Sequence, residues 1–265
     1  MRKLLTPGSH NYRIWQIGIL VILFFIWHLI SRDQHLAFFF GEPIGVFKVI
    51  WKWFITEGNI YRHLGITLSE TLLAFLIGTI AGMLMGLWMG LSRTASLIFD
   101  PYLTALNSMP RVILAPIFAM WFGLGIWSKV ALAFTLVFFI VFFNVYQGIR
   151  EVSPTLIDNA RMLGANRKQL LRYVYLPSAT SWVFSSLHAS VGLAFVGAVV
   201  GEYLGSASGV GYLILQAEGS FDINTVYAGI ITLTICALLL DGLVSVFERY
   251  FQTWKPGSRS DTQQV

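Results

Sequence analysis

Long apolar segments dominate the chain and restrict it to a membrane. Six of them alternate with polar segments, over residues 14–30, 61–91, 101–123, 128–148, 178–200 and 226–246. A helix needs about 20 mainly apolar residues to cross the bilayer core. Only 12% of the 265 residues are charged, whereas a soluble domain carries about a quarter. The sequence therefore predicts an all-helical integral membrane protein of six transmembrane helices in a single domain, 1–265.

The positions of the basic residues predict the orientation of the chain. With the N-terminus inside, the inner segments hold twelve of the 18 Lys and Arg residues, and one more, Arg111, lies within a span. The outer segments hold Arg32, Lys48, Lys52, Arg62 and Lys129. Because positive charge favours the cytoplasmic side, we expect both termini and the polar segment 151–177 in the cytoplasm. The protein is then a multi-pass protein of the cell (inner or plasma) membrane, with the lipid bilayer around it.

Neither the N-terminal segment nor the net charge changes that prediction. The first apolar run is long for a signal peptide and no small-residue cleavage site follows, so we expect it to remain as the first span. The net charge of +5 does not indicate a nucleic-acid partner, because the basic residues lie at the ends of spans and form no patch of their own.

Glycines recur along one side of the second span. They stand at intervals of four residues, at Gly78, Gly82, Gly86 and Gly90. On a helix this spacing gives a ridge without side chains, where another backbone can approach closely. We therefore predict that these four residues pack a neighbouring helix.

The third span contains two prolines, Pro110 and Pro116. Each proline lacks a backbone N–H and bends a helix. A broken helix within a membrane is typical of segments that border a transport pathway. The residues before this span, 92–100, read as a short polar turn, and residues 201–225 read as a glycine-containing and acidic loop.

Residues 151–177 form the longest strongly polar stretch between two apolar segments. Ser153 and Pro154 predict a helix start, with the serine hydroxyl as the cap and proline at the first position. An apolar stripe follows at Leu156, Ala160 and Leu163. Gly164 then ends the helix, because glycine adopts the left-handed cap conformation at low cost.

A second short helix is expected directly after Gly164. Asn166 can cap it, and Gln169 stands three residues later as the reciprocal partner. Pro177 is expected to close this helix before the fifth span. Two short helices that meet at a glycine make a compact knob (residues 151–177) at the membrane surface. We predict that its apolar stripe docks in a groove on a soluble protein.

The knob resembles the cytoplasmic coupling loop, or EAA loop, of ABC-importer permeases. The family pattern is an acidic residue, two alanines, three free positions, glycine, nine free positions, a β-branched residue, any residue and Leu-Pro. The chain supplies Asp158, Asn159, Ala160, Gly164, Val174, Leu176 and Pro177. The glycine and Leu-Pro are in register, while aspartate replaces the usual glutamate and asparagine the first alanine. Residues 67–90, 109–125 and 202–213 resemble permeases of nitrate, sulfonate, taurine and pyrimidine-precursor importers.

The resemblance implies a type I ABC-importer permease fold with the coupling helices between spans 4 and 5. It implies a homodimer of permeases, two ABC ATPase subunits under the cytoplasmic loops, and an extracytoplasmic solute-binding protein. The solute would cross by alternating access. The implied ATPase-coupling residues are Leu156, Asp158, Ala160, Arg161, Leu163, Gly164 and Pro177. The chain has no GxxxxGK[ST] phosphate loop, so we expect it to be no enzyme, with ATP and Mg²⁺ held by the partner and no cofactor, metal or catalytic residue of its own.

Candidate pathway residues are fewer. Ionisable side chains inside a span are costly and are therefore functional candidates. Arg111 either contacts an anion or forms a gate, or else it is a snorkelling or structurally paired arginine; both interpretations stay open. Glu202 either helps close the outer gate or is an ordinary interfacial glutamate. The small face of the fifth span, with Ser185, Ser186, Ala189 and Gly192, is a further candidate for the pathway lining.

Two other classes compete with an ABC permease. An ion-coupled secondary transporter or channel would need intramembrane ion relays and usually a repeated half, and it leaves the knob unexplained. An intramembrane enzyme would need a catalytic motif such as HExxH or GxSxG, and the sequence contains neither. The substrate is not selected by fold resemblance. Arg111 and the subfamily favour a small organic or inorganic anion, such as a sulfonate or nitrate, and a pyrimidine precursor stays open as an alternative.

Overall fold

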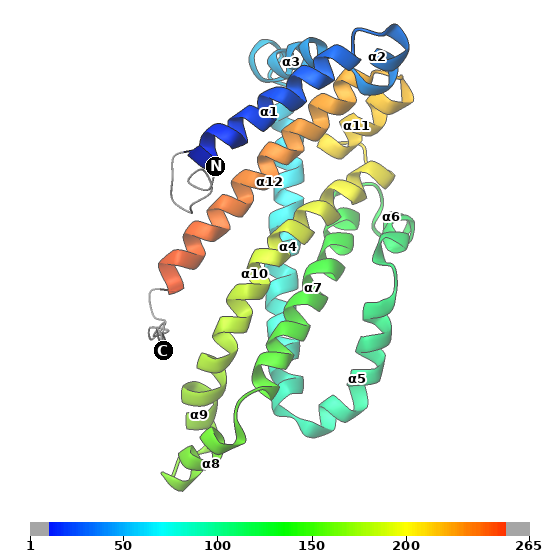
Figure 1. Cartoon of the computed structure of the whole chain (residues 1–265). Helices are drawn as coiled ribbons and strands as arrows, with labels where there is room; N and C mark the ends of the chain where they lie inside the picture. Colours follow the sequence, from blue (N-terminus) through cyan, green and yellow to red (C-terminus); the bar gives the residue numbers. More distant parts are fainter. Residues whose placement is uncertain (1–10, 253–265) are drawn as a thin grey trace. The chain divides into compact units, whose positions relative to one another are not determined.

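The structure is a computed structural model that describes the backbone of residues 11–252, and their side chains except at 11–14, 34, 179–181, 184–185 and 247–252. This part of the chain is helical and contains no strand (Figure 1). Its elements are α1 (Asn11–Ile30), α2 (Gln34–Phe40), α3 (Pro43–Trp51), η2 (Lys52–Thr56), α4 (Ile60–Leu91), α5 (Arg93–Ser108), η3 (Arg111–Leu114), α6 (Ala115–Phe122), α7 (Ile126–Arg150), α8 (Pro154–Met162), α9 (Arg167–Leu170), η4 (Leu171–Tyr175), α10 (Leu176–Gly205), α11 (Val210–Gly219) and α12 (Ile223–Gln252).

Several of these helices are long and apolar enough to cross a membrane. Four meet this criterion alone, over Ile60–Leu91, Ile126–Arg150, Ser186–Gly205 and Ile223–Val246. A bent pair, Arg93–Ser108 with Arg111–Phe122, makes a fifth if it counts as one span, and Trp15–Ile30 is a shorter apolar helix. The all-helical class is confirmed, and the described residues support four or five spans rather than the full set of six.

The third predicted span differs most from the structure. The chain does not run straight over 101–123: α5 ends at Ser108, and the helix that follows is bent by 86° from it. Pro110 explains the break, because the residue before a proline is pushed out of the helical region, and Met109 is extended at φ −74° and ψ 136°. Pro116 lies in the first turn of α6, where a missing N–H costs little.

Two segments predicted as turn or loop are instead helical. Residues 93–100 form the first turns of α5, and the Ser92 hydroxyl caps this helix by accepting a hydrogen bond from the Ala95 N–H. Within the predicted loop 201–225, α10 continues to Gly205 and α11 occupies Val210–Gly219. Short polar and glycine-containing sequences were misread here because capping residues look like turn residues.

The described residues form two compact units. The first contains residues up to His63 together with Leu213–Leu233. In it the α2–α3 turn is tied to Asn224, whose Oδ1 accepts a hydrogen bond from the Glu42 N–H at 2.7 Å. Trp27 packs on Tyr227 with ring centroids 5.8 Å apart.

The second unit contains Leu64–Tyr212 and the residues after Leu233, and it is built around α7. Helix α10 packs along α7 (Figure 1). All four glycines of the predicted ridge on α4 lie against α7. A Cβ atom added at Gly82 would lie 2.8 Å from the Phe138 carbonyl oxygen, and one at Gly86 2.9 Å from that of Phe142. The α4 and α7 backbones therefore touch without side chains between them.

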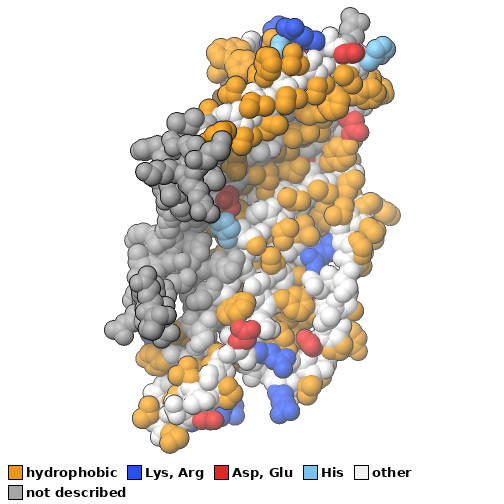
Figure 2. Space-filling view, in the orientation of Figure 1, with side chains coloured by type: hydrophobic (Ala, Val, Ile, Leu, Met, Phe, Trp, Pro, Cys, Tyr) orange, Lys and Arg blue, Asp and Glu red, His pale blue; other side chains and the backbone are white. Residues whose placement is uncertain are grey.

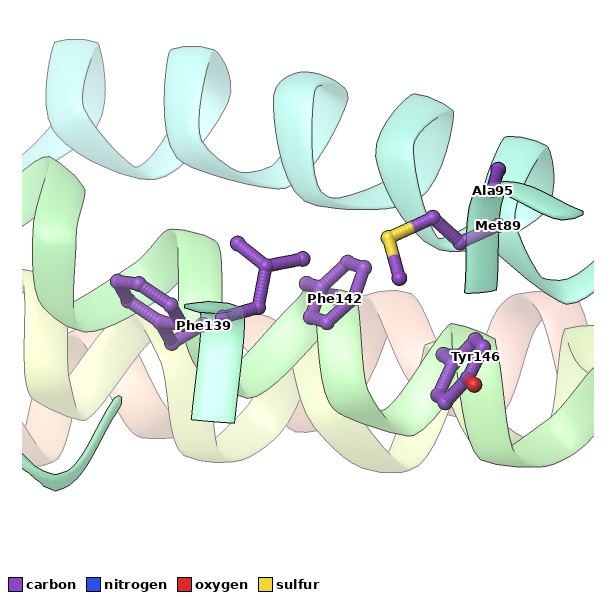
Figure 3. Close-up of a cluster of buried hydrophobic side chains, with 6 residues drawn as sticks. Met89, Ala95, Phe139, Phe142 and Tyr146 are labelled. Carbon is purple, nitrogen blue, oxygen red and sulfur yellow. The ribbon is translucent and has the colours of Figure 1, made fainter. Parts of the chain in front are cut away.

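A hydrophobic cluster fills the space beside this contact. It contains the buried residues Met89, Ala95, Leu103, Phe139, Phe142 and Tyr146. Figure 3 shows Phe139, Phe142 and Tyr146 along one side of α7, with Met89 of α4 turned toward them. The rings of Phe142 and Tyr146 are stacked at 5.7 Å. The cluster joins α4, α5 and α7 into one packed layer.

The close approach of α4 to α7 makes a testable prediction. Gly82→Ala should lower the free energy of unfolding by about 1–3 kcal/mol, as overpacking does, because the new methyl meets backbone atoms that cannot move aside. The matched control is Gly65→Ala on the same helix, where an added Cβ meets nothing within 4 Å. It should be neutral or slightly stabilising, since alanine favours helix. Thermal unfolding in detergent measures both, and equal midpoints for the two variants would contradict this packing.

Candidate functional site

The knob begins directly after α7. Pro154 occupies the first turn of α8, as predicted, but Ser153 makes no side-chain capping bond. Its backbone carbonyl accepts the N–H groups of Leu156 and Ile157 instead, at 3.0 and 3.3 Å. The hydroxyl is not needed as a cap, because proline already fixes the backbone of the first helical residue.

A left-handed glycine separates α8 from α9. Gly164 has φ +83°, and the next residue closes the turn with a hydrogen bond from the Ala165 N–H to the Ala160 carbonyl at 3.0 Å. Asn166 and Gln169 then form the reciprocal capping box predicted from the sequence, with bonds of 2.9 and 2.8 Å. These contacts give the knob its fixed two-helix geometry.

The knob has its own small core. Val152, Leu170 and Val174 are buried, and Ile157, Ala160 and Ala165 pack against them. Of the predicted stripe, Leu156 is exposed and Leu163 is 89% exposed, as a stripe that docks on another protein requires, whereas Ala160 faces inward and departs from the prediction. Met162 is also exposed. The residues that face inward are Ile157 and Ala160, so α8 presents an apolar tip of Leu156, Met162 and Leu163 to the outside.

A charged pair lies on the same helix as this tip. Asp158 and Arg161 form an exposed pair at 3.4 Å. Figure 2 shows Lys, Arg, Asp and Glu side chains gathered at this end of the second unit. The prediction that Pro177 closes the second helix is wrong. η4 runs straight into α10, and Pro177 lies in the first turn of α10. The knob is thus continuous with a long helix.

A second candidate site lies at the other end of α10. Glu202 is fully buried. Its Oε1 accepts a hydrogen bond from the Thr67 hydroxyl at 2.6 Å, and its Oε2 accepts one from the Gly211 N–H at 2.7 Å. The Val210 N–H donates to the Thr67 hydroxyl oxygen at 3.1 Å. One carboxylate therefore connects α10, α4 and the start of α11.

Two more ionisable side chains adjoin Glu202, and together with Thr67 they form the Glu202 cluster (Thr67, Glu70, Lys129 and Glu202). Glu70 and Lys129 are both fully buried. The Glu70 carboxyl interacts with that of Glu202, but its Oε2 has no hydrogen-bond partner. The Lys129 ammonium donates to the carbonyls of Leu124 and Gly125 at 2.5 and 3.0 Å, and its charge acts on both carboxyl groups. Ionisable side chains buried within membrane-spanning helices cost free energy and typically have a function.

Sequence reasoning did not find this cluster. It assigned Lys129 to an outer polar segment and treated Glu202 alone. The signal was present, since Glu70, Lys129 and Glu202 are ionisable residues within three of the long apolar helices, α4, α7 and α10. Among the described residues, no group of three or more His, Cys, Asp or Glu side chains is placed to hold a metal ion.

Arg111 lies at the break between α5 and η3. Its Nη2 donates to the backbone carbonyl of Asn107 at 3.0 Å and also contacts the Asn107 side chain. The guanidinium lies 4.7 Å from the centroid of the Phe139 ring. The residue therefore braces the bent segment against α7, and its Nε–H is a buried donor without a partner.

The small face predicted on the fifth span is not one surface. Ser186 is buried and its hydroxyl donates to the Val183 carbonyl at 2.7 Å. Ala189 is exposed, and an added Cβ at Gly192 would meet nothing within 4 Å. The side chain of Ser185 lies outside the described part. On the same helix, His188 Nε2 lies 3.0 Å from the Asp241 carboxylate of α12, a pairing that the sequence did not indicate.

Comparison with known proteins assigns a family to this architecture. Residues 78–252 match the model of the binding-protein-dependent transport system inner membrane component. The chain is 33% identical to the putative aliphatic sulfonates transport permease protein SsuC of Bacillus subtilis, over 94% of this chain and 91% of that one. It is 35% identical to the riboflavin transport system permease protein RibX of Chloroflexus aurantiacus (89% and 88% covered) and 28% identical to the taurine transport system permease protein TauC of Escherichia coli (90% and 88% covered).

Solved structures show the same fold at lower identity. A bacterial ABC transporter involved in the import of the acidic polysaccharide alginate has a chain that superposes with a TM-score of 0.61 at 18% identity, covering 91% of this chain and 97% of that one. The inward-facing MetNI methionine ABC transporter gives 0.60 at 19% identity, over 72% and 94%. The chain belongs to the binding-protein-dependent transport system inner membrane component family and is an ABC-importer permease of the sulfonate, taurine and nitrate type.

Proposed function

We propose that this permease moves an aliphatic sulfonate from an extracytoplasmic binding protein into the cytoplasm by ATP-driven alternating access. The observation that carries the proposal is the knob, which presents an apolar tip on a rigid two-helix frame in a chain of this family. Such a tip fits a groove on a partner protein. The partner is a pair of ABC ATPase subunits, which bind ATP and Mg²⁺; the chain has no phosphate loop of its own.

The geometry of the knob supports a coupling role. Its small core of Val152, Leu170 and Val174 makes the two helices move as one body. Because η4 runs into α10 without a break, any displacement of the tip is passed on to a membrane-spanning helix. Movement of two such bodies between outward- and inward-open arrangements is a two-state change. The residues that we assign to coupling are the exposed tip of Leu156, Met162 and Leu163, together with Gly164.

The assembly that we propose contains a second copy of this chain, two ATPase subunits and a solute-binding protein. Membership of the family supports an ATPase partner and a binding-protein partner, without fixing the number of copies of each. The excess of Lys and Arg in the segments on the knob side supports a cytoplasmic knob and cytoplasmic termini.

A sulfonate is favoured among the solutes of this subfamily. Relatives that cover most of this chain are named for aliphatic sulfonates or for taurine, which is itself a sulfonate. Arg111, whose Nε has no partner, is the residue that we assign to contact with the anion near the α5–η3 break. Arginine matches a sulfonate as it matches other oxyanions, through charge-assisted hydrogen bonds from a planar fork.

Substitution of Gly164 tests the coupling role. Gly164→Val forces a β-branched residue into the left-handed region, at a cost of about 1–2 kcal/mol, and should distort the turn that orients α8. Uptake should then fall at least tenfold while ATP hydrolysis no longer responds to the binding protein. Gly58→Val is the matched control, because Gly58 has φ +65° and its added Cβ meets only the Tyr61 ring, at 3.9 Å. Equal uptake by both variants in proteoliposomes would remove the coupling role.

The apolar tip can be tested without disturbing the knob. Leu163→Asp should reduce the amount of ATPase subunit that co-purifies at least tenfold, because a charge would enter an apolar groove. The side chain is 89% exposed, so the thermal midpoint of the isolated permease should not change. Leu163→Ala should have a smaller effect of the same sign. Full retention of the ATPase by the aspartate variant would show that the tip does not dock.

The substrate class can be tested in proteoliposomes that contain the permease, its ATPase and its binding protein. Radiolabelled ethanesulfonate should accumulate only when ATP is present, and unlabelled taurine or a longer alkanesulfonate should compete. Competition by riboflavin instead would transfer the assignment to a different solute. Accumulation that follows an ion gradient without ATP would overturn the ABC mechanism itself.

A further inference from the structure

We propose that Glu202 is a positioning residue for transport: a latch that holds loop 206–209 and the start of α11 onto α4, and that must release during each cycle. The inference rests on the proposed function for its transport readout, but the contact itself is independent of the substrate. It concerns the end of α10 opposite to the knob.

The latch closes on the first turn of a helix. The first N–H groups of any α-helix have no partner within that helix. In α11 the N–H groups of Val210 and Gly211 belong to this set, and Thr67 and Glu202 accept them at 3.1 and 2.7 Å. A carboxylate is also favoured there by the positive end of the helix dipole. The start of α11 is therefore fixed to α4 and α10 through a single buried group.

The backbone of the loop that leads into α11 packs closely against the Glu202 carboxylate. Gly209 has φ +103°, and an added Cβ would lie 2.1 Å from the Glu202 carboxyl carbon. At Gly211 an added Cβ would lie 2.6 Å from the Val199 carbonyl oxygen. Two glycines thus allow the backbone to come as near to Glu202 as hydrogen bonding requires. The closeness serves this contact, since neither position has room for any other side chain.

The closed arrangement is incompletely satisfied, and this makes it reversible. Glu70 adjoins Glu202, yet its Oε2 is buried with no donor. A buried polar atom without a hydrogen bond costs about 1–3 kcal/mol. If the loop and α11 move away, water reaches that atom and restores its bond, which offsets part of the cost of breaking the hydrogen bonds to Glu202 and Thr67. Release therefore costs less free energy than the opening of a fully hydrogen-bonded contact would, as a switching contact needs.

Lys129 extends the latch to another segment. Its ammonium holds the carbonyls of Leu124 and Gly125, in the turn between α6 and α7, while its charge acts on Glu70 and Glu202. Release of Glu202 changes the electrostatic surroundings of Lys129. Because Lys129 holds the turn that ends the bent α5–α6 segment, the release also affects that turn. The cluster thereby links α11, α4 and the α6–α7 turn in one contact.

The test compares two substitutions at Thr67 in the complete transporter. Thr67→Val keeps the shape but removes the hydroxyl that donates to Glu202 and accepts from Val210. Thr67→Ser keeps the hydroxyl. Both are made together with Val210→Cys, a fully buried position, and with Cys236→Ala, which removes the only native cysteine. The readouts are the rate at which a membrane-impermeant maleimide labels Cys at 210, and ATP hydrolysis with and without the binding protein.

The valine variant should label at least tenfold faster than the serine variant. Its ATP hydrolysis without binding protein should rise, so that stimulation by binding protein falls to less than half; a purely structural contact would leave this ratio unchanged. In the serine variant, binding protein and ATP together should speed labelling. Equal labelling and equal stimulation in the two variants, with ATP-driven uptake intact, would overturn the latch. Absence of ATP-driven uptake in the unsubstituted transporter would overturn the proposed function instead.

A second substitution covers the case in which Thr67→Val does not assemble. Glu202→Gln keeps the shape but leaves one acceptor oxygen, so the side chain can accept from the Thr67 hydroxyl or from the Gly211 N–H and not from both. The same increase in labelling and loss of stimulation should follow. If this variant is labelled at the same rate as the transporter in which Glu202 is unchanged, the latch is overturned.

Discussion

Direct contact between the backbones of α4 and α7 is the constraint on which the second unit depends. Apolar side chains gain little by packing against each other in lipid, so membrane helices associate through close van der Waals fit. Four glycines on α4 provide it, and Gly197 of α10 makes a similar close contact with α7, where an added Cβ would lie 2.6 Å from the Ala133 Cα atom. Held this closely, α7 becomes a fixed frame, and the bent α5–α6 segment and the knob are positioned relative to it.

The same frame carries two polar sites with opposite character. At one end, the knob keeps its apolar core inside and leaves an apolar tip exposed, an arrangement that is stable only because the tip is small. At the other, the Glu202 cluster keeps charged groups inside an apolar environment, where each hydrogen bond is strong and each missing one is costly. We propose that another protein covers the first site, whereas the second lies within the chain itself, and α10 takes part in both.

Local patterns predicted local structure well and long-range contacts poorly. The glycine spacing, the Gly164 cap and the Asn166–Gln169 box each depend on a few neighbouring residues, and the structure has them as expected. Ala160 was misassigned to the outward stripe, because only its contacts with the distant Val152 and Leu170 show that it faces inward. The 86° bend was underestimated because a proline predicts a break but not its angle. The Glu202 cluster escaped notice because its members lie up to 135 residues apart.

The unbroken passage from η4 into α10 has a mechanical consequence. Leu176 and Glu202 are 26 residues apart on one helix, which corresponds to about 39 Å of axis at about 1.5 Å per residue. A rod of that length that tilts by about 5° at one end shifts the other by roughly 3 Å, about the length of one hydrogen bond. A rotation too small to separate packed helices is thus enough to break a polar contact at the far end, so distance itself amplifies the motion.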